Sequence, residues 1–197
     1  MDGLNPPKDI QVVVNLDPAR IELESEEGIE VYQFPIVDAD AEQMGMGANE
    51  VERLFKQAVF QVIGSLQKGR SVLVHCMEGK NRTGMVVATV CAYLLKQNVN
   101  TAFGTFMDLR GRSLSANPTP TYWSFARNTL DEMNNIDIAM EKLRAFVQTS
   151  PHRSALDEGE IQKRLGQDPD LLNAILFPYS DEAFRDACAR LIGNSAT

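Results

Sequence analysis

The sequence of 197 residues is poor in cysteine, has no concentration of basic residues outside one short loop, and has no apolar run long enough to cross a bilayer. Its three cysteines, at positions 76, 91 and 188, form no disulfide framework and no zinc-ligand pattern. We therefore expect a reducing compartment, the cytoplasm or alternatively the nucleus. The formal net charge of −8 argues against a general nucleic-acid or anionic-membrane binder. Residues 1–7 look like neither a signal peptide nor a lipidation site.

One stretch, SVLVHCMEGKNRTG at residues 71–84, combines strand, loop and helix signals. Residues 71–75 predict a buried central strand, and residues 85–96 predict an apolar-rich helix. The loop between them joins the carboxyl end of a strand to the amino end of a helix, where backbone amides and the helix dipole favour an anion. We interpret it as a phosphate-binding loop made of His75, Cys76, Met77, Glu78, Gly79, Lys80, Asn81 and Arg82.

The side chains of this loop suit nucleophilic attack on phosphorus. The amides, the helix end and Arg82 are expected to lower the pKa of Cys76, so that it is a thiolate at neutral pH. Arg82, after five intervening residues, can bind two phosphoryl oxygens with its fork of N–H groups, and more strongly in the transition state. The hydroxyl of Thr83 can donate to the sulfur when it leaves. This chemistry calls for no metal and no cofactor.

The pattern His-Cys-x5-Arg-Thr at residues 75–83 resembles the signature of the cysteine-dependent protein tyrosine phosphatase superfamily, closest to its dual-specificity branch. The resemblance covers about residues 10–134. It implies an α/β fold with a central mixed, mostly parallel sheet flanked by helices. It also implies hydrolysis of phosphomonoesters through a phosphocysteine intermediate.

The resemblance also suggests a general acid and two supporting residues. In the family an aspartate lies three residues after a proline in a loop beside the active site, and Asp38 stands at that distance from Pro35. Asp40 is the alternative acid. Arg112 and Asn117 match a family segment in which the arginine holds the active-site loops and the asparagine bonds near the catalytic loop. A solvated turn is the competing interpretation of that pair.

Hydrophobic patterning predicts the remaining elements and two domains. Strands are expected at residues 10–16 and 29–35, and helices at 50–68, 99–109, 121–134, 136–149, 154–165, 169–177 and 181–192. Residues 1–136 would form the catalytic domain, and residues 137–197 an α-helical extension beyond the family resemblance. We expect this extension to pack on the core, and docking of a protein partner is the alternative.

The favoured function is a dual-specificity protein phosphatase that acts on phosphotyrosine and phosphoserine or phosphothreonine in a phosphoprotein substrate, with no nucleic-acid or membrane partner. Three alternatives stay open. Lys80 suits a phosphoinositide or inositol phosphate phosphatase, and Asn-Arg-Thr-Gly at residues 81–84 resembles the loop of RNA 5′-triphosphatases. A catalytically inactive module that only binds phosphopeptides is the third.

Overall fold

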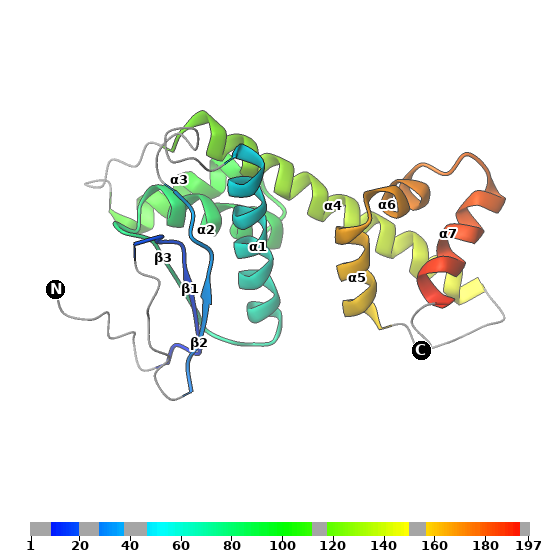
Figure 1. The fold of residues 1–197 in the computed structure, drawn as a ribbon, viewed down its shortest axis with the longest axis horizontal. Helices are drawn as coiled ribbons and strands as arrows, with labels where there is room; N and C mark the ends of the chain where they lie inside the picture. Colours follow the sequence, from blue (N-terminus) through cyan, green and yellow to red (C-terminus); the bar gives the residue numbers. More distant parts are fainter. Residues whose placement is uncertain (1–8, 20–27, 38–46, 112–117, 150–156, 194–197) are drawn as a thin grey trace. The chain divides into compact units, whose positions relative to one another are not determined.

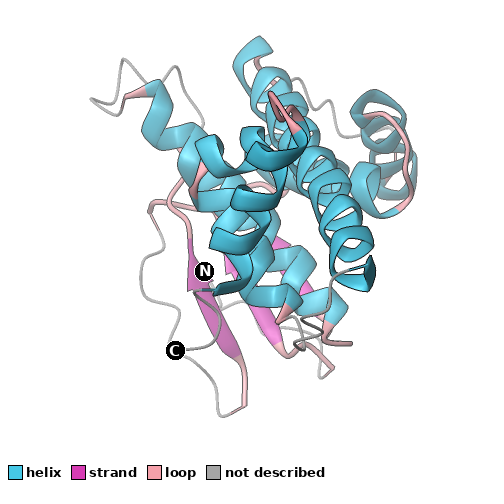
Figure 2. Cartoon of the chain, turned by 90° about the vertical axis from the view of Figure 1, so that its right-hand side faces the viewer, coloured by secondary structure: helices cyan, strands magenta, loops and turns pink. Residues whose placement is uncertain are grey.

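The computed structural model describes residues 9–19, 28–37, 47–111, 118–149 and 157–193. Three strands and seven helices are assigned in these ranges (Figures 1 and 2). The chain forms two compact units, Met1–Leu130 and Asp131–Thr197. No described helix has the length and apolar character needed to cross a membrane.

The first unit is built on a parallel sheet of strands β1 (Val12–Asn15), β2 (Glu30–Gln33) and β3 (Val72–His75), in the order β2-β1-β3. Every residue of β1 is buried, as expected for a β-branched strand with neighbours on both sides. In the described part of the sheet β3 lies at an edge, and its first three residues are only half-buried. Among the described strands, the central position that we predicted for residues 71–75 is therefore taken by β1.

Helices α1 (Ala48–Gln67) and α2 (Asn81–Leu94) contact β3 and each other, and α3 (Val99–Arg110) packs on α2. Two helices begin earlier than predicted. Helix α1 begins at Ala48 rather than at residue 50, and its N-cap, Gly47, makes no side-chain hydrogen bond. Helix α2 begins four residues before the predicted residue 85. The prediction missed this first turn because its polar residues do not show the spacing of apolar residues that marks a helix.

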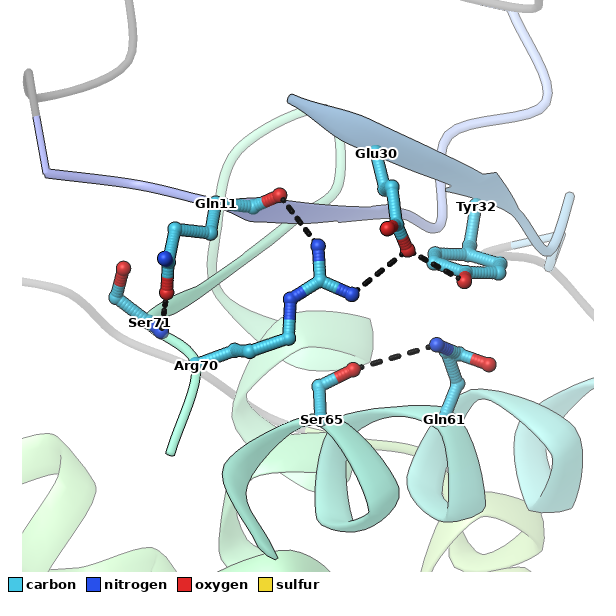
Figure 3. A network of polar contacts seen from close by, with 7 residues as sticks. All are labelled: Gln11, Glu30, Tyr32, Gln61, Ser65, Arg70 and Ser71. Carbon is cyan, nitrogen blue, oxygen red and sulfur yellow. Dashed lines mark hydrogen bonds and ion pairs between the residues drawn. The ribbon is translucent and has the colours of Figure 1, made fainter. Parts of the chain in front are cut away.

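A polar network ties together the starts of the three strands (Figure 3). Arg70, just before β3, pairs with Glu30 at 2.8 Å and donates to the carbonyl of Gln11 at 3.2 Å. Tyr32 donates to the same Glu30 carboxylate, and the amide of Ser71 donates to the Gln11 side chain. These exposed contacts align the amino ends of the parallel strands, so their carboxyl ends lie together at the opposite end of the sheet.

The second unit is helical. Helix α4 (Pro120–Thr149) contributes to both units, and α5 (Glu158–Gln167), α6 (Pro169–Leu176) and α7 (Asp181–Gly193) follow it. The two helices predicted at 121–134 and 136–149 are thus one, because no residue between them breaks a helix. The predicted start of the helix at residue 154 lies outside the described residues, and Asp157 caps α5.

The apolar faces of the second unit meet in a core of their own. This core consists of Ile136, Ala139, Met140, Leu143, Ile161, Leu165, Leu171, Leu172, Ile175, Leu176, Ala187, Cys188 and Leu191. Lys142 donates to the carbonyl of Leu176 at the end of α6, and Arg164 donates to the carbonyl of Leu191 near the end of α7. Positively charged side chains therefore act as donors to main-chain carbonyls at the carboxyl ends of α6 and α7. The packing of this unit on the catalytic core stays a prediction.

Candidate active site

The predicted phosphate-binding loop connects the end of β3 at His75 to the start of α2 at Asn81. Its thiol is buried, with Cys76 only 6% exposed, whereas the next side chain, Met77, is 70% exposed. The amide of Gly79 donates a hydrogen bond to Sγ of Cys76, with an N···S distance of 3.2 Å. The loop therefore turns its backbone donors toward the sulfur, as expected for a cradle that binds an anion.

Two glycines make this geometry possible. Gly79 has a φ of +69°, and a Cβ there would lie 3.2 Å from Nη2 of Arg110. A Cβ on Gly84, in the first turn of α2, would lie 2.9 Å from ring carbons of both Phe103 and Phe106. Gly79 thus permits the turn, and Gly84 permits the close approach of α3 to the helix that ends the loop.

The pKa of Cys76 is lowered by its surroundings. Burial of the sulfur raises the pKa, but hydrogen bonds from the hydroxyl and amide of Thr83, the charge of Arg82 and the amide of Gly79 together outweigh it. The Thr83 hydroxyl is buried near the sulfur, lowers the pKa of Cys76, and makes no hydrogen bond of ordinary geometry among the described residues, so its proton is available to the sulfur. The direction of the shift agrees with the expected thiolate.

Arg82 joins the loop to two other segments of the first unit. Its side chain is nearly buried, with the residue 3% exposed, and Nη1 donates to the carbonyls of Ile36 at 2.9 Å and Leu16 at 3.4 Å. The amide of Ile36 in turn donates to the carbonyl of Leu16. The guanidinium is therefore fixed where the loop, the end of β1 and the segment after β2 meet.

The charged side chains of Lys80 and Glu78 in the loop are partly and largely exposed, respectively. Lys80 forms an ion pair with Glu78 at 3.0 Å, and the side chain of Glu78 is 64% exposed. His75 is buried at the end of β3. In the described residues, no group of three or more His, Cys, Asp or Glu side chains is placed to hold a metal ion.

Four candidates, Asp38, Asp40, Arg112 and Asn117, lie outside the described residues. The structure does describe the residue before Asp38. The carbonyl of Val37 accepts a hydrogen bond from the hydroxyl of Tyr122 in α4, 85 positions away in the chain. Sequence reasoning missed Tyr122, because a tyrosine in a helix carries no local signal for a bond to a distant carbonyl.

The remaining cysteines have a different character. All three are free thiols in the structure. Burial raises the pKa of Cys91, and it raises the pKa of Cys188 to about 11. Only Cys76 among them is surrounded by groups that stabilise a thiolate.

The family model for the dual specificity phosphatase catalytic domain matches residues 4–126, which include the whole loop around Cys76. The chain belongs to this family. Its predicted superfamily and its α/β fold are confirmed, and the helices after residue 130 lie beyond the match. No curated protein matches the sequence.

Two solved structures are similar to the chain. Human DUSP28 is 17% identical, with a TM-score of 0.51 over 64% of this chain and 78% of the other. This likeness supports the dual-specificity phosphatase fold and nothing finer. A leucine rich repeat and phosphatase domain containing protein from Entamoeba histolytica is 12% identical, with a TM-score of 0.47 over 66% of this chain and 77% of the other.

Proposed function

We propose that the chain is a phosphomonoester hydrolase that acts through a phosphocysteine intermediate, and that its substrates are phosphoproteins carrying phosphotyrosine and phosphoserine or phosphothreonine. The thiolate of Cys76 attacks phosphorus as the bond to the leaving oxygen breaks, and Asp38 gives that oxygen a proton. Water then attacks the phosphocysteine, Asp38 accepts its proton, and the sulfur leaves with the help of the Thr83 hydroxyl. No step calls for a metal or a cofactor.

The observation that carries this proposal is the environment of the Cys76 sulfur. A thiolate is the nucleophilic form of cysteine, and here a buried sulfur keeps a lowered pKa through donors from Thr83 and Gly79 and the charge of Arg82. The same donors can bind phosphoryl oxygens. A binding module without activity needs the anion cradle but has no use for an activated nucleophile, so this environment favours the enzyme.

The surroundings of Lys80 favour monophosphorylated protein sites over highly phosphorylated substrates. Its ammonium group pairs with Glu78 at 3.0 Å, so part of its positive charge is compensated beside the loop. An inositol polyphosphate or an RNA 5′-triphosphate would bring several negative charges close to the Glu78 carboxylate. A phosphorylated side chain of a protein brings fewer negative charges near Glu78. Its single phosphoryl group would contact only the loop amides and Arg82.

The proposal is tested by turnover of a small aryl phosphate in the presence of chelator and thiol reductant. The wild-type chain is expected to turn over, and Cys76→Ser is expected to lose turnover while it still binds tungstate. Cys91→Ser serves as the control, because burial raises the pKa of that thiol. Equal turnover by Cys76→Ser and the wild type would refute the mechanism. A wild type that binds tungstate without turnover would instead identify a binding module.

The substrate class is tested with a panel of phosphotyrosine, phosphoserine and phosphothreonine peptides, phosphoinositides, soluble inositol phosphates and RNA 5′-triphosphate. We expect the highest kcat/KM on the peptides. A kcat/KM at least tenfold higher on an inositol phosphate or on RNA would overturn the assignment of protein substrates, and it would leave the phosphocysteine chemistry in place.

A further inference from the structure

The segment that leads to Asp38 is held at two successive carbonyl groups. Strand β2 ends at Gln33, and the chain then continues beside β1, with the amide of Ile36 donating to the carbonyl of Leu16. The carbonyl of Ile36 accepts from Arg82 at 2.9 Å, and the carbonyl of Val37 accepts from the hydroxyl of Tyr122. Both side chains are buried, so both peptide groups are fixed away from water.

Tyr122 is itself held firmly. It lies in the first turns of α4, after Pro120 at the start of the helix, and only 4% of it is exposed. Its ring packs on Phe55 at a centroid distance of 6.3 Å and edge-on against Phe125 at 6.1 Å. A rigid aromatic cluster thus presents the hydroxyl to Val37, and removal of the oxygen alone would leave the packing of the ring unchanged.

We propose that Tyr122 is a positioning residue for the general-acid step, acting through its hydrogen bond to the carbonyl of Val37. This inference rests on the proposed function. Val37 and Asp38 share a peptide bond, so a donor on the Val37 carbonyl fixes the orientation of the peptide plane that enters Asp38. A misplacement of about 1 Å in a catalytic group lowers rates by up to roughly a hundredfold.

Loss of Arg82 and loss of Tyr122 should have different effects on the reaction. Arg82 contacts both the nucleophile loop and the Ile36 carbonyl, so its loss would impair phosphate binding and chemistry together. Tyr122 contacts the Val37 carbonyl, which lies outside the loop of Cys76 and directly precedes Asp38 in the chain. In the first step, phosphoryl transfer to Cys76, its effect should therefore appear only where a proton must reach the leaving oxygen, and this distinguishes positioning of the acid from a general loss of structure.

The test uses Tyr122→Phe in the full chain, with Tyr32→Phe as the matched control. Tyr32 also donates its hydroxyl within the first unit, but to Glu30 at the start of β2. We expect Tyr122→Phe to lower kcat/KM, which reports phosphoryl transfer to Cys76, by about tenfold or more on a phosphotyrosine peptide and by less than about twofold on an aryl phosphate with an acidic leaving phenol. Tyr32→Phe should leave both rates within about twofold of the wild type.

Two further measurements exclude a merely structural effect. Tungstate affinity of Tyr122→Phe should stay within about twofold of the wild type. Replacement of Tyr122 by para-aminophenylalanine, which keeps a donor at the same ring position, should restore most of the lost rate. If Tyr122→Phe fails to fold, the rates of this second variant on the two substrates still test the inference.

A double-mutant cycle locates the effect. In the background of Asp38→Asn, or of Asp40→Asn if that variant carries the leaving-group-dependent loss, Tyr122→Phe should cause no further decrease, because there is no acid left to position. Additive losses, equal losses on both substrates, or parallel loss of tungstate binding would overturn the inference. A wild type without turnover would refute the proposed function itself, whereas an active wild type with an unaffected Tyr122→Phe would refute this inference alone.

Discussion

The guanidinium of Arg82 donates to the carbonyl of Ile36 over 2.9 Å, a contact between the helix after the predicted phosphate-binding loop and a segment 46 positions earlier. Nη1 also donates to the carbonyl of Leu16 at 3.4 Å, so two main-chain acceptors hold this end of the guanidinium. In the proposed mechanism, the transition state would therefore meet donors that need no rearrangement.

Arg82→Lys should therefore lower turnover of aryl phosphate by about two to three orders of magnitude, because the charge stays while the fork of donors is lost. Arg53→Lys is the matched control. Arg53 makes a two-pronged contact with Glu50, at 2.9 and 2.6 Å, on the exposed face of α1, and its replacement should leave turnover unchanged. A loss of only a few-fold in Arg82→Lys would show that Arg82 does not clamp the phosphoryl group.

Thr83→Ala should raise the pKa of Cys76, because the variant removes the hydroxyl that helps to lower it. A thiol with a lowered pKa is a thiolate at lower pH, so alkylation of Cys76 by iodoacetamide should rise at a lower pH than alkylation of Cys91 or Cys188. In Thr83→Ala the rise should shift to higher pH.

The measurement is the pH dependence of alkylation, resolved by mass spectrometry of the cysteine peptides. Thr105→Ala, which removes a hydroxyl that donates to the carbonyl of Thr101 on exposed α3, should leave the curve unchanged. An identical curve for Thr83→Ala and the wild type would mean that the hydroxyl does not stabilise the thiolate.

Gly84→Ala should destabilise the first unit by about 1–3 kcal/mol, because its Cβ would lie 2.9 Å from the rings of Phe103 and Phe106 and α3 would have to move. Gly64→Ala in α1 is the control, since a Cβ there meets nothing within 4 Å. It should be neutral or stabilising by up to about 1 kcal/mol. Urea unfolding measures both variants, and equal stability would contradict the close packing of α2 and α3.

Asp38→Asn should lower kcat/KM for phosphotyrosine peptide by about two or more orders of magnitude, and kcat/KM for aryl phosphates with good leaving groups much less, because kcat/KM reports phosphoryl transfer to Cys76 and only poor leaving groups need a proton in that step. Asp40→Asn should be close to neutral. The reverse outcome would move the acid by two residues and keep the reaction class.

The local arrangement of the loop around Cys76 was predictable from sequence, because its parts are close together in the chain. A strand, a cysteine, five residues and an arginine at the start of a helix bring thiol, amides and guanidinium together whatever the rest of the fold does. The identity of the loop, the α/β class and the apolar face of α1 follow from such local patterns.

Long-range features were not predictable in this way. The hydrogen bond from Tyr122 to Val37 spans 85 positions, and a tyrosine at that place in a helix is equally compatible with simple packing. The continuity of α4 was missed because Asn134 and Asn135 have weak helix propensity, and only the packing around them decides whether the helix continues. The edge position of β3 depends on strand pairing, which a single strand sequence does not encode.

The central claim is that Cys76 carries the phosphoryl group between the two halves of the reaction. It is tested most directly by a denaturing quench during turnover of an aryl phosphate with a radiolabelled phosphoryl group, followed by peptide mapping. We expect covalent label on the peptide that contains Cys76, in a larger amount when Asp38→Asn slows hydrolysis of the intermediate, and no label in Cys76→Ser. Sustained turnover by the wild-type chain with no label on Cys76 would contradict the account.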